Sequence, residues 1–362
     1  MTSPVIHVQG AVLVGPDEVR EEAWILGGRI TYEEPRHSGA LETVSGYVLP
    51  GLVDAHCHVG LDQHGAVPPE VAIEQATTDR DAGALLLRDA GSPLDTHFID
   101  EIEDLPRIIR AGRHIARTRR YIPHFAHEIE PEDLVAYVRA QARIGDGWVK
   151  LVGDWIDREA GDLRPCWPVE ALTQAIAAAH EEGARVTAHC FGEQSLHDFA
   201  AAGTDCIEHA TGLTTQSIDA FARDGIAIVP TLVNIENFPA FADAGEAKFP
   251  TYADHMRDLY ARRYDTIGAA YEAGVPIYVG TDAGGALAHG LVAQEVAELV
   301  TAGMSRLDAI GAATWTAREW LGREGLQEGA PADLVVFDAD PREDVGVLAD
   351  PRHVVLRGRR VG

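Results

Sequence analysis

The middle of this 362-residue chain alternates short apolar runs with stretches of helical periodicity. Four of these stretches, 131–145, 168–183, 215–225 and 291–303, are amphipathic, and several have Pro or Thr near the start and Gly at the end. Eight strands alternating with helices over about 280 residues are typical of an α/β chain folded as a (β/α)8 TIM-type barrel, whose chemistry lies at the C-terminal ends of its strands. The apolar runs end near His58, Asp89, residues 121–124, Lys150, His189, His209, Thr231 and Asp282.

The first run, Val48 to Gly60, ends in a His-x-His pair, His56 and His58. Residues two apart on a strand project from the same face, so both imidazoles can bind one metal ion from one side. Further candidate ligands follow other apolar runs, and they strengthen the interpretation of the His-x-His pair as part of a metal site. The pattern therefore predicts a metal centre at the strand ends, with Lys150, His189, His209 and Asp282 as its further candidate ligands.

Charge excludes several classes of partner. The chain has 30 basic and 57 acidic residues, a net charge of −27 that repels phosphate backbones and anionic lipid. We therefore expect a small-molecule substrate and neither a nucleic-acid nor a membrane partner, while a homo-oligomer stays open. Because no secretion signal and no long apolar segment is apparent, we predict a cytoplasmic protein. The four cysteines suggest neither a disulfide framework nor a CxxC site.

Both ends of the chain show strand patterns. Residues 1–47 contain three short β segments with tight-turn glycines, and 332–340 and 352–361 are similar. Residues 1–47 are too few to form a good core alone. We therefore predict that 1–47 and 330–362 combine into a small β-sandwich domain around the barrel, which spans 48–329.

Several motifs carry a resemblance to a known family. VDAHCH, WVKLVG, VTAHCFG, CIEHAT and VGTDAG, followed by ADLVVFDAD and VVLRGRRV, resemble the amidohydrolase superfamily across nearly the whole chain. Within it, the pattern is most similar to the prolidase and imidazolonepropionase-like group of binuclear metal hydrolases. The resemblance implies two zinc ions, one held by His56, His58 and Asp282, a second held by His189 and His209, and a carboxylated Lys150 that bridges them.

The chemistry of these residue types agrees with that assignment. Zinc favours imidazole nitrogen and carboxylate oxygen, and a catalytic zinc site leaves a position open for water. A hydroxide between two metals is a strong nucleophile near neutral pH, while the metals polarise the carbonyl under attack. Asp282 can then act as general base and acid, moving the proton to the leaving nitrogen. We therefore predict a binuclear zinc hydrolase of a C–N bond in an amide, cyclic amide, dipeptide-like or carbamate substrate.

Lys150 is one of only two lysines, the other being Lys248, against 28 arginines. A charged amine facing four histidines would repel the metals. Arginine stays protonated in proteins, whereas the pKa of a lysine falls when it is desolvated or near another cation. A neutral lysine amine can react with carbon dioxide to give a carbamate that bridges two metals. The alternative is an ordinary lysine paired with Asp146 or Asp154.

The substrate contacts are less defined. We assign Tyr121 and His124, at the end of the predicted third strand, and His289, after the last strand, as candidate substrate-binding residues. His289 lines the site or caps the next helix. Relatives that cleave dipeptides usually carry a Gly-Gly-His type sequence after strand three, where this chain reads RRYIPHFAHEIE. The sequence therefore supports a hydrolytic core and names no substrate.

Two other enzymatic interpretations stay open. The same dimetal site could hydrolyse a lactone or ester. A mononuclear zinc deaminase would use His56, His58, His189 and Asp282, with His209 as a hydrogen-bond donor, and would not need Lys150. A metal-binding scaffold without catalysis is disfavoured because no ligand position is substituted.

Overall fold

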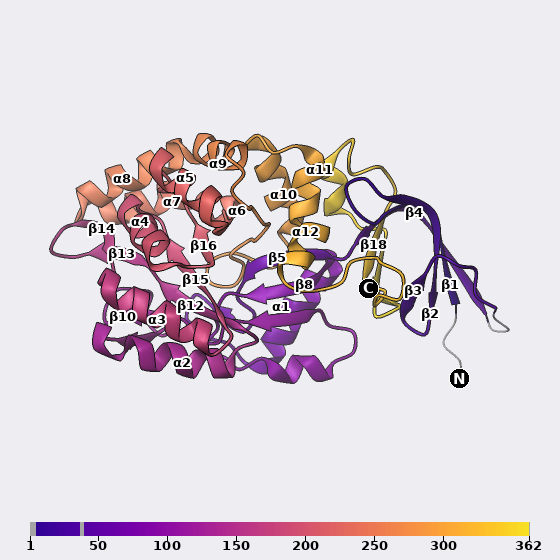
Figure 1. The fold of residues 1–362 in the computed structure, drawn as a ribbon, viewed down its shortest axis with the longest axis horizontal. Helices are drawn as coiled ribbons and strands as arrows, with labels where there is room; N and C mark the ends of the chain where they lie inside the picture. The colour runs from indigo at the N-terminus through magenta and orange to yellow at the C-terminus, as the bar shows by residue number, and fades with distance from the viewer. Residues whose placement is uncertain (1–4, 37–39, 362) are drawn as a thin grey trace.

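The structure, a computed structural model, describes residues 5–36 and 40–361. Helices and mostly parallel strands form its larger part, and a β-sheet lies at one end of the molecule (Figure 1). The helices are α1 (Pro69–Asp81), α2 (Leu134–Ile144), α3 (Val169–Glu181), α4 (Glu193–Ala202), α5 (Thr215–Asp224), α6 (Leu232–Ile235), α7 (Phe238–Glu246), α8 (Pro250–Ala261), α9 (Arg263–Glu272), α10 (Val292–Thr301), α11 (Arg306–Ala312) and α12 (Trp315–Trp320).

The parallel strands form two sheets that together curl around the apolar core. One sheet has the order β5-β8-β9 and the other the order β11-β10-β12-β15-β16-β17. Residues 277–283 bridge β17 to β5 through the isolated pairs Ile228 with Ile277 and Cys57 with Ala283. The strands are β5 (Leu52–Cys57), β8 (Ala84–Asp89), β9 (Arg107–Arg110), β10 (Ile115–Arg117), β11 (His127–Ile129), β12 (Trp148–Val152), β15 (Arg185–Cys190), β16 (Cys206–His209) and β17 (Ala227–Val229).

These elements confirm the α/β class and correct two predicted strands. The four amphipathic stretches are α2, α3, α5 and α10. Burial of one apolar face explains each, and α5 also has a capping box in which Thr214 and Ser217 exchange hydrogen bonds. The eighth run forms only isolated bridges rather than a ladder. The closed eight-stranded barrel stays a prediction.

The predicted third run, 114–124, begins with a strand, β10, but ends in a loop, and the strand that pairs with β8 is the earlier β9. β9 pairs with β8 in parallel, whereas residues 121–124 lie in the loop between β10 and β11. The sequence of β9, RIIR, has only two apolar residues between charged ends, so pattern alone does not reveal it. Pairing with a neighbouring strand, rather than apolar length, makes this segment a strand.

Strands from both ends of the chain share one seven-stranded sheet of order β20-β19-β18-β4-β1-β2-β3. β18 pairs antiparallel with β4, and the sheet has a separate apolar core that includes Val8, Val48 and Val336. The sandwich arrangement and the boundaries at 47 and 330 stay predictions. The strands are β1 (Val5–Leu13), β2 (Val19–Leu26), β3 (Arg29–Thr31), β4 (Leu41–Pro50), β18 (Leu334–Phe337), β19 (His353–Leu356) and β20 (Arg359–Val361).

Two short hairpins and three 3-10 turns complete the chain. All four cysteines are buried and free, and Cys166 is as buried as the three strand cysteines. None of the helices in the described residues combines the length and hydropathy of a transmembrane span. The hairpins are β6 (Leu61–Asp62) with β7 (Gly65–Ala66) and β13 (Asp154–Asp157) with β14 (Asp162–Pro165), and the 3-10 turns are His97–Glu101, Pro131–Asp133 and Val345–Ala349.

Candidate metal centre

The His-x-His pair and Asp282 converge at the end of β5. His56 Nε2 lies 3.2 Å from His58 Nε2, and Asp282 Oδ1 lies 3.1 Å and 2.9 Å from these two nitrogens. Both histidines are buried. Three donor atoms from two segments far apart in the sequence thus face one point, as the ligands of a single metal ion do.

Two glycines let Asp282 reach this position. A Cβ at Gly280 would lie 2.7 Å from the nitrogen of His56, and one at Gly284 would lie 2.7 Å from Cβ of His58. Glycine therefore permits a close approach of this segment to β5. The Asp282 N–H donates to the His56 carbonyl at 2.7 Å, with φ of +60° at Asp282, an uncommon conformation for a non-glycine residue.

The outer ring nitrogens fix the orientation of both histidines. His58 Nδ1 lies 2.6 Å from the Gly91 carbonyl oxygen, which can only accept, so Nδ1 carries the proton and Nε2 keeps its lone pair. His56 Nδ1 lies 2.8 Å from Glu208 Oε2, which imposes the same tautomer when that carboxylate is ionised. Two lone pairs and a carboxylate oxygen therefore meet, and a cation relieves their repulsion.

Glu208 is the centre of a buried network beneath the metal centre. Its Oε1 accepts from Arg88 Nη2 at 2.7 Å and from the Thr187 hydroxyl, and all three side chains are buried. Burial alone would raise the pKa of Glu208, but Arg88, His56 and Lys150 hold it well below its usual range. Glu208 is therefore an anion that orients His56 rather than a reacting group. The sequence analysis missed it, although it stands directly before His209 in CIEHAT.

His189 and His209 form the other half of the centre. His189 Nδ1 lies 2.9 Å from His209 Nε2, and the His209 ring lies 5.2 Å from the His56 ring between centroids. Thr231 Oγ1 lies 2.7 Å from His209 Nδ1 and orients that ring. Burial lowers the pKa of His209 to about 3 and that of His189 well below its usual value. Both imidazoles are therefore neutral, the form that binds metal.

Lys150 lies on β12, beside the strand of His189, and only 1% of its surface is exposed. Burial lowers the pKa of its amine, outweighing the opposing effect of Glu208 and Asp282. A neutral amine needs no counter-ion, and within the described residues no carboxylate oxygen lies within 4.0 Å of this one. The state required for reaction with carbon dioxide is therefore favoured here.

The two expected counter-ions of an ordinary lysine are engaged elsewhere. Asp146 Oδ2 accepts from Arg110 Nη1 at 3.1 Å. Asp154 accepts from the N–H groups of Phe191 and Gly192, the latter at 2.8 Å. Neither acid forms an ion pair with Lys150, so the structure gives no support to the ordinary-lysine alternative.

The residues present thus fit a two-metal centre by donor chemistry and orientation. Four imidazoles, one carboxylate and one buried lysine supply nitrogen and oxygen ligands of the types zinc prefers. His189 Nε2 is buried and has no hydrogen-bond partner. The grouping that geometry alone identifies as a metal site is His56, His58 and Asp282.

A pocket of about 1000 Å³ opens over this centre, part of it continuous with solvent. Tyr121 lines it, as a substrate contact should, although it comes from a loop and not from a strand end. His124 is exposed and does not line it, and buried His289 binds Asp79 of α1, with Nδ1 2.8 Å from Oδ2. The lining comprises His58, Leu61, Tyr121, Ile122, Phe125, Trp155, His189, Phe191, Asn234, Phe241, Ala244, Tyr252, Asp282, Gly285 and Ala286.

Asn234 is a further residue that the sequence analysis missed. Its Nδ2 donates to Asp282 Oδ2 at 2.7 Å, opposite the oxygen that faces the histidines. Burial would raise the pKa of Asp282, but the adjacent His56 and His58 hold it well below its usual range. No motif marks Asn234, because it lies in the short helix α6, and only the fold brings it to Asp282.

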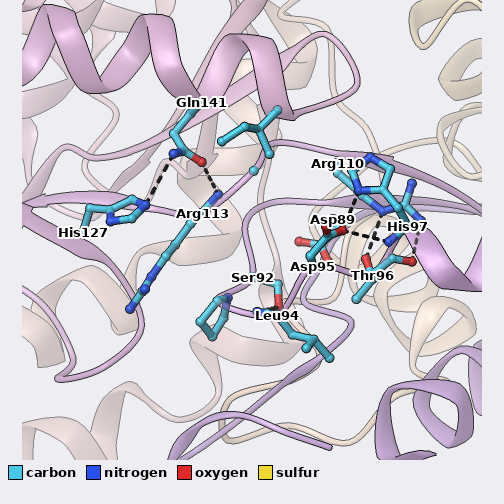
Figure 2. A pocket seen from close by; sticks show the side chains of 13 residues that line it. Asp89, Ser92, Leu94, Asp95, Thr96, His97, Arg110, Arg113, His127 and Gln141 are labelled. Carbon is cyan, nitrogen blue, oxygen red and sulfur yellow. Dashed lines mark hydrogen bonds and ion pairs between the residues drawn. The ribbon is translucent and has the colours of Figure 1, made fainter. Parts of the chain in front are cut away.

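A second cavity lies beside the ends of β8 and β9, and Figure 2 shows the side chains that line it. Arg110 donates to the hydroxyl and carbonyl of Thr96, both at 2.9 Å, and forms an ion pair with Asp100. Asp95 likewise accepts from His97 at 2.6 Å. Arg110, Thr96, Asp100, Asp95 and His97 are thus satisfied within the wall, whereas Asp89 Oδ2 in the same lining is buried and has no hydrogen-bond partner among the described residues.

Comparisons with known proteins identify similar sequences. A sequence model described as "Amidohydrolase family" matches residues 47–361. An uncharacterised protein of Mycobacterium tuberculosis is 58% identical over 360 residues, which cover 99% of this chain and 96% of that protein. Ochratoxinase of Aspergillus niger is 28% identical over 232 residues, or 62% of this chain and 47% of that protein.

A solved structure extends the likeness to the whole fold. The crystal structure of a Xaa-Pro dipeptidase with bound methionine superposes with a TM-score of 0.81 at 24% identity, and the match covers 99% of both chains. At that level of identity the match shows a shared fold, and the chemistry has to be argued from the residues of this chain.

Proposed function

Because the chain belongs to the amidohydrolase family and is a hydrolytic enzyme acting on carbon–nitrogen bonds, we propose that it is a binuclear zinc hydrolase of an amide, cyclic amide, dipeptide-like or carbamate bond. The observation that carries the proposal is the convergence of four imidazoles, Asp282 and a buried lysine beneath one pocket. The ligands would be His56, His58 and Asp282 for one ion and His189 and His209 for the other, with carboxylated Lys150 shared.

Bound ions would polarise the substrate carbonyl and lower the pKa of the attacking water. The residues of the chain supply the remaining steps. A water oxygen bonds to the carbonyl carbon, the C–N bond breaks, and one water proton passes through Asp282 to the leaving nitrogen. Asn234 holds Asp282 Oδ2, which leaves Oδ1 directed at the histidines.

Tyr121 is the candidate for orienting the substrate. Burial, and secondarily the charge of Asp282, raises the pKa of its hydroxyl, so it stays a hydrogen-bond donor at neutral pH. Its ring packs 4.9 Å from that of Trp155 and 5.7 Å from that of His189, between centroids. A donor in this place can hold a substrate carbonyl oxygen beside the centre.

The role of Lys150 distinguishes the proposed binuclear hydrolase from a mononuclear deaminase. Its amine would add to carbon dioxide, forming an N–C bond and releasing one proton, to give an anionic carbamate. A deaminase has no use for such a group, and a buried lysine without an ion-pair partner among the described residues is costly unless it is neutral or modified. We also propose a cytoplasmic location for the enzyme.

Elemental analysis and an activity screen test the proposal. Gently desalted protein should carry about two divalent ions per chain, and it should cleave at least one of a panel of N-acyl amino acids, dipeptides, cyclic ureides and carbamates. A reproducible content near one ion in metal-replete protein would favour the deaminase. Cleavage confined to lactones or esters would replace the C–N assignment.

A further inference from the structure

We propose that the substrate is uncharged beside its scissile bond and carries an aromatic or similarly large apolar group, so that free dipeptides and other amino acids with an α-carboxylate are poor substrates. This inference deepens the proposed function and rests on it. It follows from which groups line the pocket over the metal centre and which charged groups are absent from that lining.

The walls of the pocket are aromatic. Six rings line it, and four aliphatic side chains fill the remaining wall. The Tyr121 and Trp155 rings meet edge to face, and the Phe191 ring lies 4.3 Å from that of His189, which places apolar surface directly beside the ligands. Rings of this kind favour flat apolar groups through edge-to-face and stacked contacts. The six rings belong to Tyr121, Phe125, Trp155, Phe191, Phe241 and Tyr252.

No cationic side chain is available to bind a substrate carboxylate. Within the described residues, neither Lys nor Arg is among the groups that line this pocket. Arg120, which precedes the lining residue Tyr121 in the same loop, is held by Asp157 at 2.9 Å and by the carbonyls of Trp155 and Arg164. Arg113 donates to two backbone carbonyls, those of residues 124 and 125. An α-carboxylate on the leaving group would therefore be desolvated among aromatic rings without a partner.

The pocket also offers no free carboxylate to pair with a substrate ammonium group. Asp282 is the sole carboxylate in the lining, and it already bonds to His56, His58 and Asn234. The net charge of −27 adds a long-range repulsion of anionic substrates.

Hydrolysis of a neutral amide with water yields a carboxylic acid and an amine, which ionise at neutral pH. The amine product therefore becomes charged among aromatic rings, where the carboxylate of Asp282 is already engaged, which favours its release.

A pair of matched substrates tests the inference. N-benzoyl-2-phenylethylamine and N-benzoyl-phenylalanine share the scissile amide and both rings, and differ only by the carboxylate. With metal-replete enzyme we expect kcat/KM for the neutral amide to be at least about 100-fold higher. Equal rates, or faster cleavage of the carboxylate, would overturn the inference while leaving C–N hydrolysis intact.

A binding measurement gives a readout that does not need turnover. The corresponding benzenesulfonamides, with and without the carboxylate, are not cleaved by amide hydrolysis, and Trp155 in the pocket wall provides a fluorescence signal. The neutral sulfonamide should bind at least about 30-fold more tightly. If it does so but no C–N bond in any compound is cleaved, the proposed function fails and the substrate-class inference survives. Tighter binding of the carboxylate overturns the inference.

Introducing a cation should reverse the preference. Phe241 is 36% exposed at the pocket rim on α7, so Phe241→Arg should fold, and Ala286→Arg, at an exposed lining position, is a second variant. Either should raise the ratio of kcat/KM for N-benzoyl-phenylalanine to kcat/KM for the neutral amide about tenfold, because the new cation pairs with the carboxylate. Ala240→Arg, exposed on α7 but outside the lining, is the matched control and should change neither. Failure of both rim variants to improve the carboxylate substrate would contradict the assigned role of charge.

Discussion

The metal centre and the polar cavity beside it both lie at the ends of neighbouring strands, yet their polar groups behave differently. In the polar cavity, Arg110 binds Thr96, Asp100 and Asp146, so its charge is balanced within the wall. In the metal centre, the lone pairs of His56 and His58 point at each other and at a carboxylate. Polar residues at strand ends do not by themselves identify a site. A metal site is indicated instead when several lone pairs and a carboxylate converge on one point, because a cation there relieves their repulsion.

The largest effect should follow from removing the one group that can become a bridging carbamate. Lys150→Arg keeps the charge but cannot be neutral or carboxylated, so we expect activity to fall by more than about 10³-fold and bound metal to drop. Lys248→Arg, at the other, exposed lysine, is a matched control that should change neither. Metal analysis and kcat/KM on the same samples measure both effects.

Chemical rescue sharpens this test. Lys150→Ala should regain part of its activity when a short carboxylic acid is added, because the acid can occupy the space of the carbamate. Metal-free wild-type protein should also regain activity faster when zinc is supplied with bicarbonate. Wild-type turnover and metal content in Lys150→Arg would exclude the carbamate bridge.

The ligand set was predictable from the sequence because strand-end positions and residue chemistry coincide there. His56, His58, His189, His209 and Asp282 each follow an apolar run, and the fold brings the predicted partners within hydrogen-bond distance of one another. The groups that hold them, by contrast, carry no local signal. Their roles arise from contacts between distant segments, namely Glu208 with Arg88, Gly91 with His58, and Asn234 with Asp282.

The same limit explains why the sequence pattern missed β9 and did not define the pocket. The β9 segment is too polar for its apolar pattern to be recognised, and pairing with β8 decides its conformation. His289 resembled a site residue because it follows the last strand. Its side chain instead contacts Asp79 on α1 and does not line the pocket. The pocket walls come from several loops and helices, for example Tyr121, Phe191 and Tyr252, and no sequence window contains them together.

A smaller effect is expected one contact away from the ligands. Glu208→Gln keeps the shape of the side chain but removes the charge that holds His56 Nδ1 and pairs with Arg88. We expect metal affinity to fall about 10- to 100-fold, measured by chelator competition, with activity partly restored at saturating zinc. Asp95→Asn, an exposed acid in the polar cavity, is the control and should leave metal affinity unchanged. Unaltered affinity in Glu208→Gln would show that the Glu208 network is only structural.

The polar cavity should respond through stability alone. Arg110→Gln removes hydrogen bonds to Thr96 and two partly exposed ion pairs, so the free energy of unfolding should fall by about 1–3 kcal/mol. Urea unfolding measures this loss. We expect kcat/KM at 25 °C to stay within about twofold of wild type. A stable variant with a tenfold loss of activity would mean that the second cavity takes part in function and that the contrast between the two cavities is wrong.

The smallest effect, a change in melting temperature, is expected at the wall of the pocket near Tyr252 rather than at its floor, the metal centre. His255 on α8 joins Glu193 of α4 at 3.0 Å and Asp162 of β14 at 2.9 Å, three residues along the helix from Tyr252 of the lining. The hydrogen bond to Glu193, and then that to Asp162, outweigh partial burial and raise the pKa of His255 to about 9.

The sign of the resulting pH dependence follows from that direction. The pKa of His255 in the folded protein lies above its unfolded value of 6.5, so the stabilisation is complete below pH 6.5 and is lost as the pH rises from 6.5 through about 9. Because the ring is partly exposed to solvent, we expect about 1 kcal/mol or less, or about 1–2 °C in melting temperature. Between pH 6 and pH 9.5 the melting temperature of wild type should decrease more than that of His255→Gln. Both proteins should keep the same metal content. Parallel profiles would show that these ion pairs do not hold the wall, and a loss of metal would show that wall and floor are not separate.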